Sequence, residues 1–261
     1  MLSKLLKNDL KKNMHWLWIL FVSTIAVAGI TRGCKELGKT IAFFKIMGIF
    51  FDSVFYALAV NVILHPFLRN FLNFTKSFYS DEAYLTHTLP VTKTQLINSK
   101  YLTALIEMTL GFASLIISIL ILFISPTMFD FLKMIFATII TGKFSLTLSL
   151  ILFIILVIVE FSMFLSIIYF AIVKAYQSKE KRFLKAFAIS AAMAFASLAV
   201  LTVAMIIVLL INKVKFSTSN LILSSSAFIS VLLTGIVVYT ASTILFYCLA
   251  KREFNKGVNI D

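Results

Sequence analysis

The stretch that decides the fold lies at residues 67–100 and reads FLRNFLNFTKSFYSDEAYLTHTLPVTKTQLINSK. It is the longest segment that is not continuously apolar, and long apolar segments lie on both sides of it. Pro66 comes directly before it and predicts the end of the preceding helix, because proline has no N–H and disfavours helical geometry in the residue before it. A new helix is then expected, because phenylalanines recur on one helical face at positions 67, 71, 74 and 78.

Two further helix starts follow within the same stretch. Ser-Asp-Glu at 80–82 places a capping hydroxyl and two acids where the helix dipole favours negative charge, and this short helix should end before Leu89-Pro90. Thr-Lys-Thr-Gln at 92–95 forms a capping box, from which a helix should continue past Lys100 into the next apolar segment. The stretch therefore predicts a helix, a short helix and a third helix in succession.

The composition identifies the protein as an integral membrane protein. Hydrophobic residues make up 61% of the chain and charged residues 13%, with a mean hydropathy of +1.01. Soluble domains contain about 45–50% hydrophobic residues and about 25% charged residues. The net charge of +13 does not indicate nucleic-acid binding, because the cations lie at the ends of apolar segments and do not gather on one polar face.

The expected architecture is an all-α membrane protein that forms one domain over residues 1–261. Six transmembrane helices are predicted, at about 14–31, 41–65, 101–125, 144–172, 184–211 and 221–249. Residues 1–13 alternate lysines with leucines, which is typical of an amphipathic helix lying on anionic membrane lipid.

The distribution of lysine and arginine predicts the orientation in the membrane. With both termini in the cytoplasm, the inner segments hold sixteen of these residues and the outer segments hold seven. Residues 66–100 are then cytoplasmic. An extracellular amphipathic helix is expected at 127–141, between spans three and four, because that loop carries a broad apolar face.

Three acidic residues within the predicted spans are candidates for a translocation path. They are Asp52, Glu107 and Glu160, and a charge in the membrane interior costs at least about 2.5–3.5 kcal/mol, so each needs a reason. Asp52 lies two turns from Lys45 on the same helical face, although a direct pair would require the lysine stem to reach along the helix. Lys45 itself can extend to the membrane surface. Glu107 is expected to pair with a lysine at the inner surface.

Catalytic and metal-binding patterns are lacking in the sequence. His15, His65 and His87 are too far apart to have metal-ligand spacing. Gly142-Lys143 resembles the end of a phosphate-binding loop, but the residues around it do not complete the Walker pattern. We therefore expect no catalytic residue, no metal and no cofactor in this chain, so any uphill transport must draw on another polypeptide or on an ion gradient.

Residues 78–92, FYSDEAYLTHTLPVT, continue to Gln95, Ser99 and Lys100 and resemble a segment common in permease subunits of bacterial ABC-2-type ABC transporters. The basic N-terminal helix and six spans with both ends inside are also similar to that family. The family often has outer re-entrant helices between spans five and six. Here that loop is only Asn212–Asn220, and the additional outer helix lies between spans three and four.

The resemblance implies a half-transporter in the bacterial cell (inner or plasma) membrane. Two permease subunits, alike or different, would form the path, and a separate cytoplasmic ABC ATPase would bind ATP and Mg²⁺. Leu2–Asn13 would be the connecting helix, and Asp81–Leu89 would be the coupling helix that docks the ATPase. The implied ATPase-coupling residues are Asp81, Glu82, Tyr84, Leu85, His87, Leu89 and Pro90.

Three functions remain open from the sequence. The first is the permease of an ATP-driven exporter for an amphipathic peptide, antibiotic or lipid-like molecule. The second is an ion-gradient-driven carrier that uses Asp52 and Glu160. Carriers often interrupt spans at mid-depth with glycine or proline, whereas all three prolines here lie at the ends of predicted spans, which favours the first function. The third is a non-transporting sensor or assembly subunit.

Overall fold

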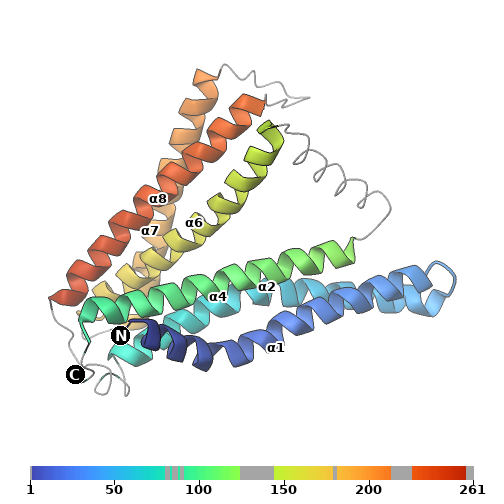
Figure 1. The fold of residues 1–261 in the computed structure, drawn as a ribbon, viewed down its shortest axis with the longest axis horizontal. Coiled ribbons are helices and arrows are strands. Elements are labelled where there is room, and N and C mark those ends of the chain that lie inside the picture. The colour runs from blue at the N-terminus through green and yellow to red at the C-terminus, as the bar shows by residue number, and fades with distance from the viewer. Residues whose placement is uncertain are drawn as a thin grey trace. The chain divides into compact units, whose positions relative to one another are not determined.

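The computed structural model describes residues 2–79, 83, 88, 91–123, 144–178, 181–212 and 225–256, which contain long α-helices and no β-strand. In chain order these helices are α1 (Leu2–Leu37), α2 (Ala42–Tyr79), α4 (Lys93–Leu122), α6 (Phe144–Ala175), α7 (Arg182–Ile211) and α8 (Ser225–Asn255) (Figure 1). Each of the six is long and apolar enough to cross a membrane.

Large apolar side chains are exposed along these helices. Phe195 is 73% exposed, Ile211 72% and Ile46 68%. In water such surfaces would drive association, whereas in a bilayer they face lipid tails, and a helix satisfies its own backbone hydrogen bonds there. The chain is therefore a multi-pass membrane protein, as its composition predicts.

The described helices pack in two compact units. The first unit comprises Met1–Phe74 and Leu89–Phe131, so it contains α1, most of α2 and α4. Leu17 and Phe21 of α1 pack with Val62 of α2 in one buried cluster. A second buried cluster of the same unit joins residues of all three helices, which are Ala28, Phe55 and Leu122.

The second unit comprises Thr75–Thr88 and Leu132–Asp261, so it contains α6, α7, α8 and the last turn of α2. Helix α6 packs against both α7 and α8, and α7 packs against α8. Their shared core consists of Met163, Ile167, Leu201, Tyr239 and Phe246.

The predicted helix end at Pro66 is wrong. Helix α2 continues through Pro66 to Tyr79, over 38 residues. A proline leaves the carbonyl four residues earlier, here that of Val62, without its helical hydrogen bond. Helix α4 covers that carbonyl closely, because a β-carbon at Gly111 would lie only 3.2 Å from the Val62 oxygen. Membrane helices tolerate an internal proline more readily than helices in water do, because neighbouring helices and local adjustments of the helix re-satisfy the freed group.

The other helix boundaries agree in part with the sequence prediction. Thr92 caps α4 with a complete capping box: the Gln95 N–H donates to Thr92 Oγ1 and the Thr92 N–H donates to Gln95 Oε1. The predicted amphipathic helix 1–13 is not a separate element, because α1 runs without a break from Leu2 into the first span. The predicted outer helix at 127–141 lies outside the described residues.

Candidate functional site

Polar side chains gather in the first unit where α1 begins and α4 begins. Asp9 of α1 accepts two hydrogen bonds from α4 through its carboxylate oxygens. Ser99 Oγ donates to Asp9 Oδ2 at 2.9 Å, and Lys100 Nζ donates to Asp9 Oδ1 at 2.7 Å. The Lys100 and Asp9 side chains are 19% and 14% exposed, so this ion pair is largely shielded from solvent. It ties the start of α1 to the start of α4.

The same end of α1 is also bonded to α2. Asn73 Nδ2 donates to Asn13 Oδ1 at 3.0 Å. Arg69 Nη2 donates to the Lys12 carbonyl at 3.3 Å. These bonds join segments about 60 positions apart in the sequence, so they form only when α1 and α2 have packed.

Glu107 joins α4 to α2. It is completely buried, and its Oε2 accepts a hydrogen bond from Asn70 Nδ2 at 2.9 Å. Asn70 Nδ2 also donates to the Pro66 carbonyl at 2.8 Å, which occupies both of its N–H groups. The expected partner of Glu107 was an inner-surface lysine. Lys100, seven residues earlier, instead pairs with Asp9, and an asparagine binds Glu107.

We call these residues the polar cluster: Asp9, Asn13, Asn70, Asn73, Ser99, Lys100 and Glu107. Its hydrogen bonds connect α1 to α4, α1 to α2, and α2 to α4. Hydrogen bonds between membrane helices contribute about 0.6 kcal/mol each on average and about 1.7 kcal/mol at most, so several acting together can hold three helix ends as one body. The cluster contains no obvious reactive pair, and its chemistry is that of a structural brace.

Sequence reasoning missed most of this cluster, although a signal was present. Asp9 and Asn13 are four residues apart, and Asn70 and Asn73 are three apart, so each pair lies on one face of its helix. Uncharged amides carry no formal charge, so the cost of burying charge in a membrane does not single them out. A polar stripe on an otherwise apolar helix is the pattern that would have identified them.

The predicted ATPase-coupling residues lie between α2 and α4, outside the described residues: Asp81, Glu82, Tyr84, Leu85, His87, Leu89 and Pro90. Two positions among them are described: Ala83 is completely buried and Thr88 is exposed. The flanks of this segment are described on both sides. After it, α4 begins at the Thr92 capping box, seven residues before Ser99 of the polar cluster.

Before the segment, the last turn of α2 packs within the second unit. The ring of Phe78 meets the ring of Phe254 of α8 edge-on, with centroids 4.9 Å apart. The ring of Tyr79 lies 4.5 Å from that of Tyr176, just after α6, and the Arg182 guanidinium lies 5.7 Å from the Tyr176 centroid. Aromatic contacts therefore anchor the residues directly before position 80 to the ends of α6 and α8, and Arg182 at the start of α7 packs on the same Tyr176.

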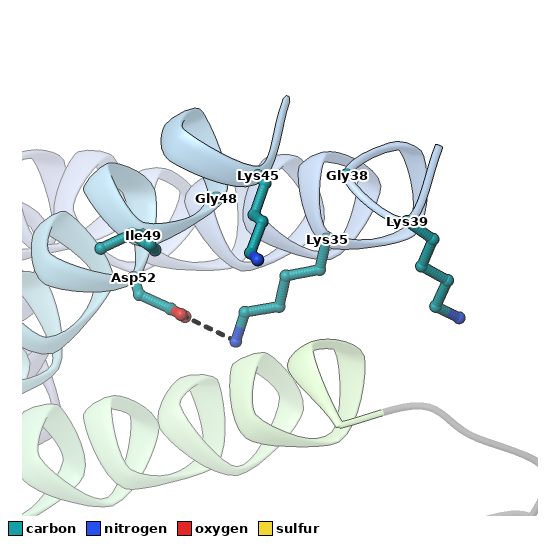
Figure 2. Close-up of a pocket in the computed structure, with 7 residues that line it drawn as sticks. All are labelled: Lys35, Gly38, Lys39, Lys45, Gly48, Ile49 and Asp52. Carbon is teal, nitrogen blue, oxygen red and sulfur yellow. Dashed lines mark ion pairs between the residues drawn. The ribbon is translucent and has the colours of Figure 1, made fainter. Parts of the chain in front are cut away.

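Asp52 pairs with Lys35 of α1. Lys35 Nζ lies 2.8 Å from Asp52 Oδ2, whereas the sequence offered Lys45 of the same helix as the nearest cation (Figure 2). Asp52 Oδ1 is buried without a hydrogen-bond partner among the described residues. Asp52 and Glu107 do not share a site: Glu107 binds Asn70, and positions 52 and 70 of α2 are about 27 Å apart along the helix.

The Lys35–Asp52 ion pair can be tested by a double-mutant cycle. Lys35→Ala is expected to lower the free energy of unfolding by about 1 kcal/mol, the upper range for partly exposed pairs. Adding Asp52→Asn should then cost little more, because the carboxylate no longer needs a counter-charge. The measurement is SDS-induced unfolding in detergent. Arg32→Ala, which removes an ion pair within α1 to Glu36, is the matched control and should cost about 0.3–0.5 kcal/mol. Strictly additive costs in the cycle would contradict the pair.

Glu160 lies on α6 in the second unit and is half-buried. No ion pair of Glu160 is found among the described residues. Within the same residues, no group of three or more histidine, cysteine, aspartate or glutamate side chains could hold a metal ion.

Comparison with protein-family models, with curated proteins and with solved structures finds no match to this chain.

Proposed function

We propose that this chain is the permease subunit of an ATP-driven exporter. In this proposal both termini are cytoplasmic, the membrane is the bacterial cell membrane, and a separate ABC ATPase docks on residues 81–90. A second permease subunit completes the path for an amphipathic peptide, antibiotic or lipid-like cargo. The chain itself hydrolyses nothing.

The observation that carries the proposal is the anchoring of both flanks of this segment. On one side, Phe78 and Tyr79 pack on the helix ends of the second unit. On the other side, Ser99 and Lys100 bind Asp9 in the first unit. A protein that pushes on residues 81–90 would therefore move helix ends that are firmly held. A flexible linker would not absorb that movement.

The length of the helices supports the same mechanism. Helix α2 contains 38 residues without a break, so it is about 57 Å long, and α4 contains 30 residues and is about 45 Å long. A continuous helix transmits a displacement of one end along its whole length. ATP-driven closure of the partner ATPases would thus tilt α2 and α4, and the polar cluster would make α1 follow them.

The ion-gradient carrier gains no support from its two acids. Asp52 is held in an ion pair with Lys35, which leaves it poorly suited to bind and release a cation. Glu160 is half-buried on α6, and among the described residues it belongs to no group of three or more acidic, histidine or cysteine side chains that could hold a cation. The exporter remains the proposal that the described contacts favour.

The proposal predicts that Leu85→Asp abolishes association with the ATPase, because a charge in the docking helix would have to be buried in the apolar groove of the partner. Tyr84→Ala should weaken the association by about tenfold, as expected for loss of an aromatic contact worth about 1–2 kcal/mol. The measurement is the ATP-hydrolysing activity that co-purifies with the tagged chain.

Lys93→Ala is the control, since Lys93 is an exposed residue of the first turn of α4 beyond the docking segment. It should retain the co-purifying activity. Unfolding temperatures of all variants in detergent would separate lost docking from lost folding. Transport that persists without any ATPase, but stops when the proton or sodium gradient is collapsed, would refute the proposal in favour of a carrier.

A further inference from the structure

A hollow of about 460 Å³ opens beside the turn that joins α1 to α2, and it lies entirely within the first unit. Its lining is shown in Figure 2 and consists of Lys35, Gly38, Lys39, Lys45, Gly48, Ile49 and Asp52. None of these residues belongs to the polar cluster or to the predicted docking segment.

Two glycines shape this hollow. A β-carbon at Gly38 would lie 2.9 Å from the Cys34 carbonyl oxygen and from the backbone of Lys45, so only glycine allows α1 and α2 to meet this closely. A β-carbon at Gly48 would lie 3.6 Å from Lys35 Cγ. That distance is an ordinary van der Waals contact, so the stem of Lys35 passes close over position 48 on its way to Asp52.

The hollow carries an excess of positive charge. Three lysines line it against a single aspartate. Lys35 is paired with Asp52, and Lys39 is paired with Glu36 outside the lining. The ammonium group of Lys45 has no hydrogen bond or ion pair among the described residues, and Figure 2 shows it pointing into the same space as the end of Lys35. At least one cation is therefore available for an anionic ligand.

The surface next to the hollow is apolar and exposed. On α2, Ile49 lines the hollow and is 64% exposed, and Tyr56 and Val60 follow it on the same helical face with 58% and 55% of their surface exposed. The hollow also lies at one end of α1 and α2, which are both long enough to cross a membrane. The ends of such helices lie at the depth where lipid headgroups meet hydrocarbon. Cationic donors beside an exposed apolar face match the two parts of a phospholipid.

We propose that this hollow binds the phosphate group of a phospholipid headgroup. Lys45 and Lys35 donate to the phosphate oxygens, since lysine acts as a point charge toward phosphate and one phosphate accepts from more than one ammonium. Asp52 is a positioning residue that holds Lys35 extended over Gly48. The acyl chains lie along the exposed face of α2 that contains Ile49, Tyr56 and Val60. This site is independent of the proposed transport function.

The test measures lipid binding to the purified full-length chain in detergent by native mass spectrometry, with no ATPase present. Phosphatidylglycerol is the probe, diacylglycerol is the same lipid body without phosphate, and inorganic phosphate is the soluble competitor. Lys45→Gln should bind phosphatidylglycerol about fivefold more weakly, the value expected for one lysine near a lipid phosphate. Lys45→Arg should restore most of the affinity. Because Lys45 has no protein partner among the described residues, its replacement should leave folding intact.

Lys93→Gln removes an exposed lysine at the opposite end of the first unit and should leave the affinity unchanged. The proposal is overturned if Lys45→Gln binds as tightly as the unaltered chain, or if Lys93→Gln weakens binding equally. It is also overturned if diacylglycerol binds as tightly as phosphatidylglycerol. Displacement of the lipid by inorganic phosphate at equal concentration would assign the hollow to a soluble phosphate and overturn the lipid headgroup.

Discussion

The Phe254→Ala variant is expected to unfold with a free energy about 3–5 kcal/mol lower than that of the unaltered chain, the range found when a fully buried phenylalanine is truncated. Phe254 is completely buried, and so is Phe78, whose ring it meets edge-on. Truncation would leave a cavity between α8 and the last turn of α2. In the proposed exporter the variant should also transport poorly while it still retains its ATPase, because the docking residues are unchanged.

SDS-induced unfolding in detergent measures the first effect, and comparison of ATP hydrolysis with transport in vesicles measures the second. Phe228→Ala is the matched control, since Phe228 lies on the same helix and is 43% exposed, and it should change stability by no more than about 0.5 kcal/mol. Equal effects of the two truncations would show that the last turn of α2 does not depend on Phe254.

The Gly111→Leu variant is expected to lose about 1–3 kcal/mol of stability, because added bulk in a well-packed site forces the neighbouring helix away. A β-carbon at Gly111 would already lie 3.2 Å from the Val62 oxygen and 3.4 Å from the ring of Phe21. The displaced helix α2 would expose the carbonyl that Pro66 leaves without its helical hydrogen bond. It would also pull Asn70, which lies two turns from Val62 on α2, away from Glu107, which lies one turn from Gly111 on α4.

Gly29→Leu provides the matched control, because nothing lies within 4 Å of a β-carbon at that helical position. It should be neutral or slightly stabilising, since glycine is a poor helix former. Gly111→Ala should fall between the two, because a shift of a few tenths of an ångström relieves its contacts. A cost for Gly29→Leu as large as that for Gly111→Leu would show that helix propensity, and not the contact between α2 and α4, sets the effect.

Pro66 illustrates where local reasoning fails. Proline ends helices in water because the freed carbonyl must find another partner, and the sequence shows no partner nearby. The close approach of α4 to this carbonyl occurs at Gly111, which is 45 positions later in the chain and on another helix. The capping box at Thr92 was predictable for the opposite reason: all of its hydrogen bonds lie within four consecutive residues.

The candidate acids also combine one feature that the sequence predicts with another that depends on the packing of other helices. Their cost in a membrane is visible in the sequence, so Asp52, Glu107 and Glu160 could be identified as residues that need an explanation. Their partners could not be identified, because Lys35 and Asn70 lie on other helices from the acids they bind. The ATPase-coupling role of residues 81–90 stays a prediction that the co-purification experiment will test.

The sequence by itself determined that the described part of this protein contains six helices long and apolar enough to span a membrane, because hydrophobic length and helix caps act within short segments. Tertiary structure alone decided that α2 continues through Pro66, that Glu107 meets an asparagine, and that the polar cluster joins three helix ends. The physical reason is range: burial and capping are set by neighbouring residues, whereas the pairing of polar groups depends on which helices come to lie against one another.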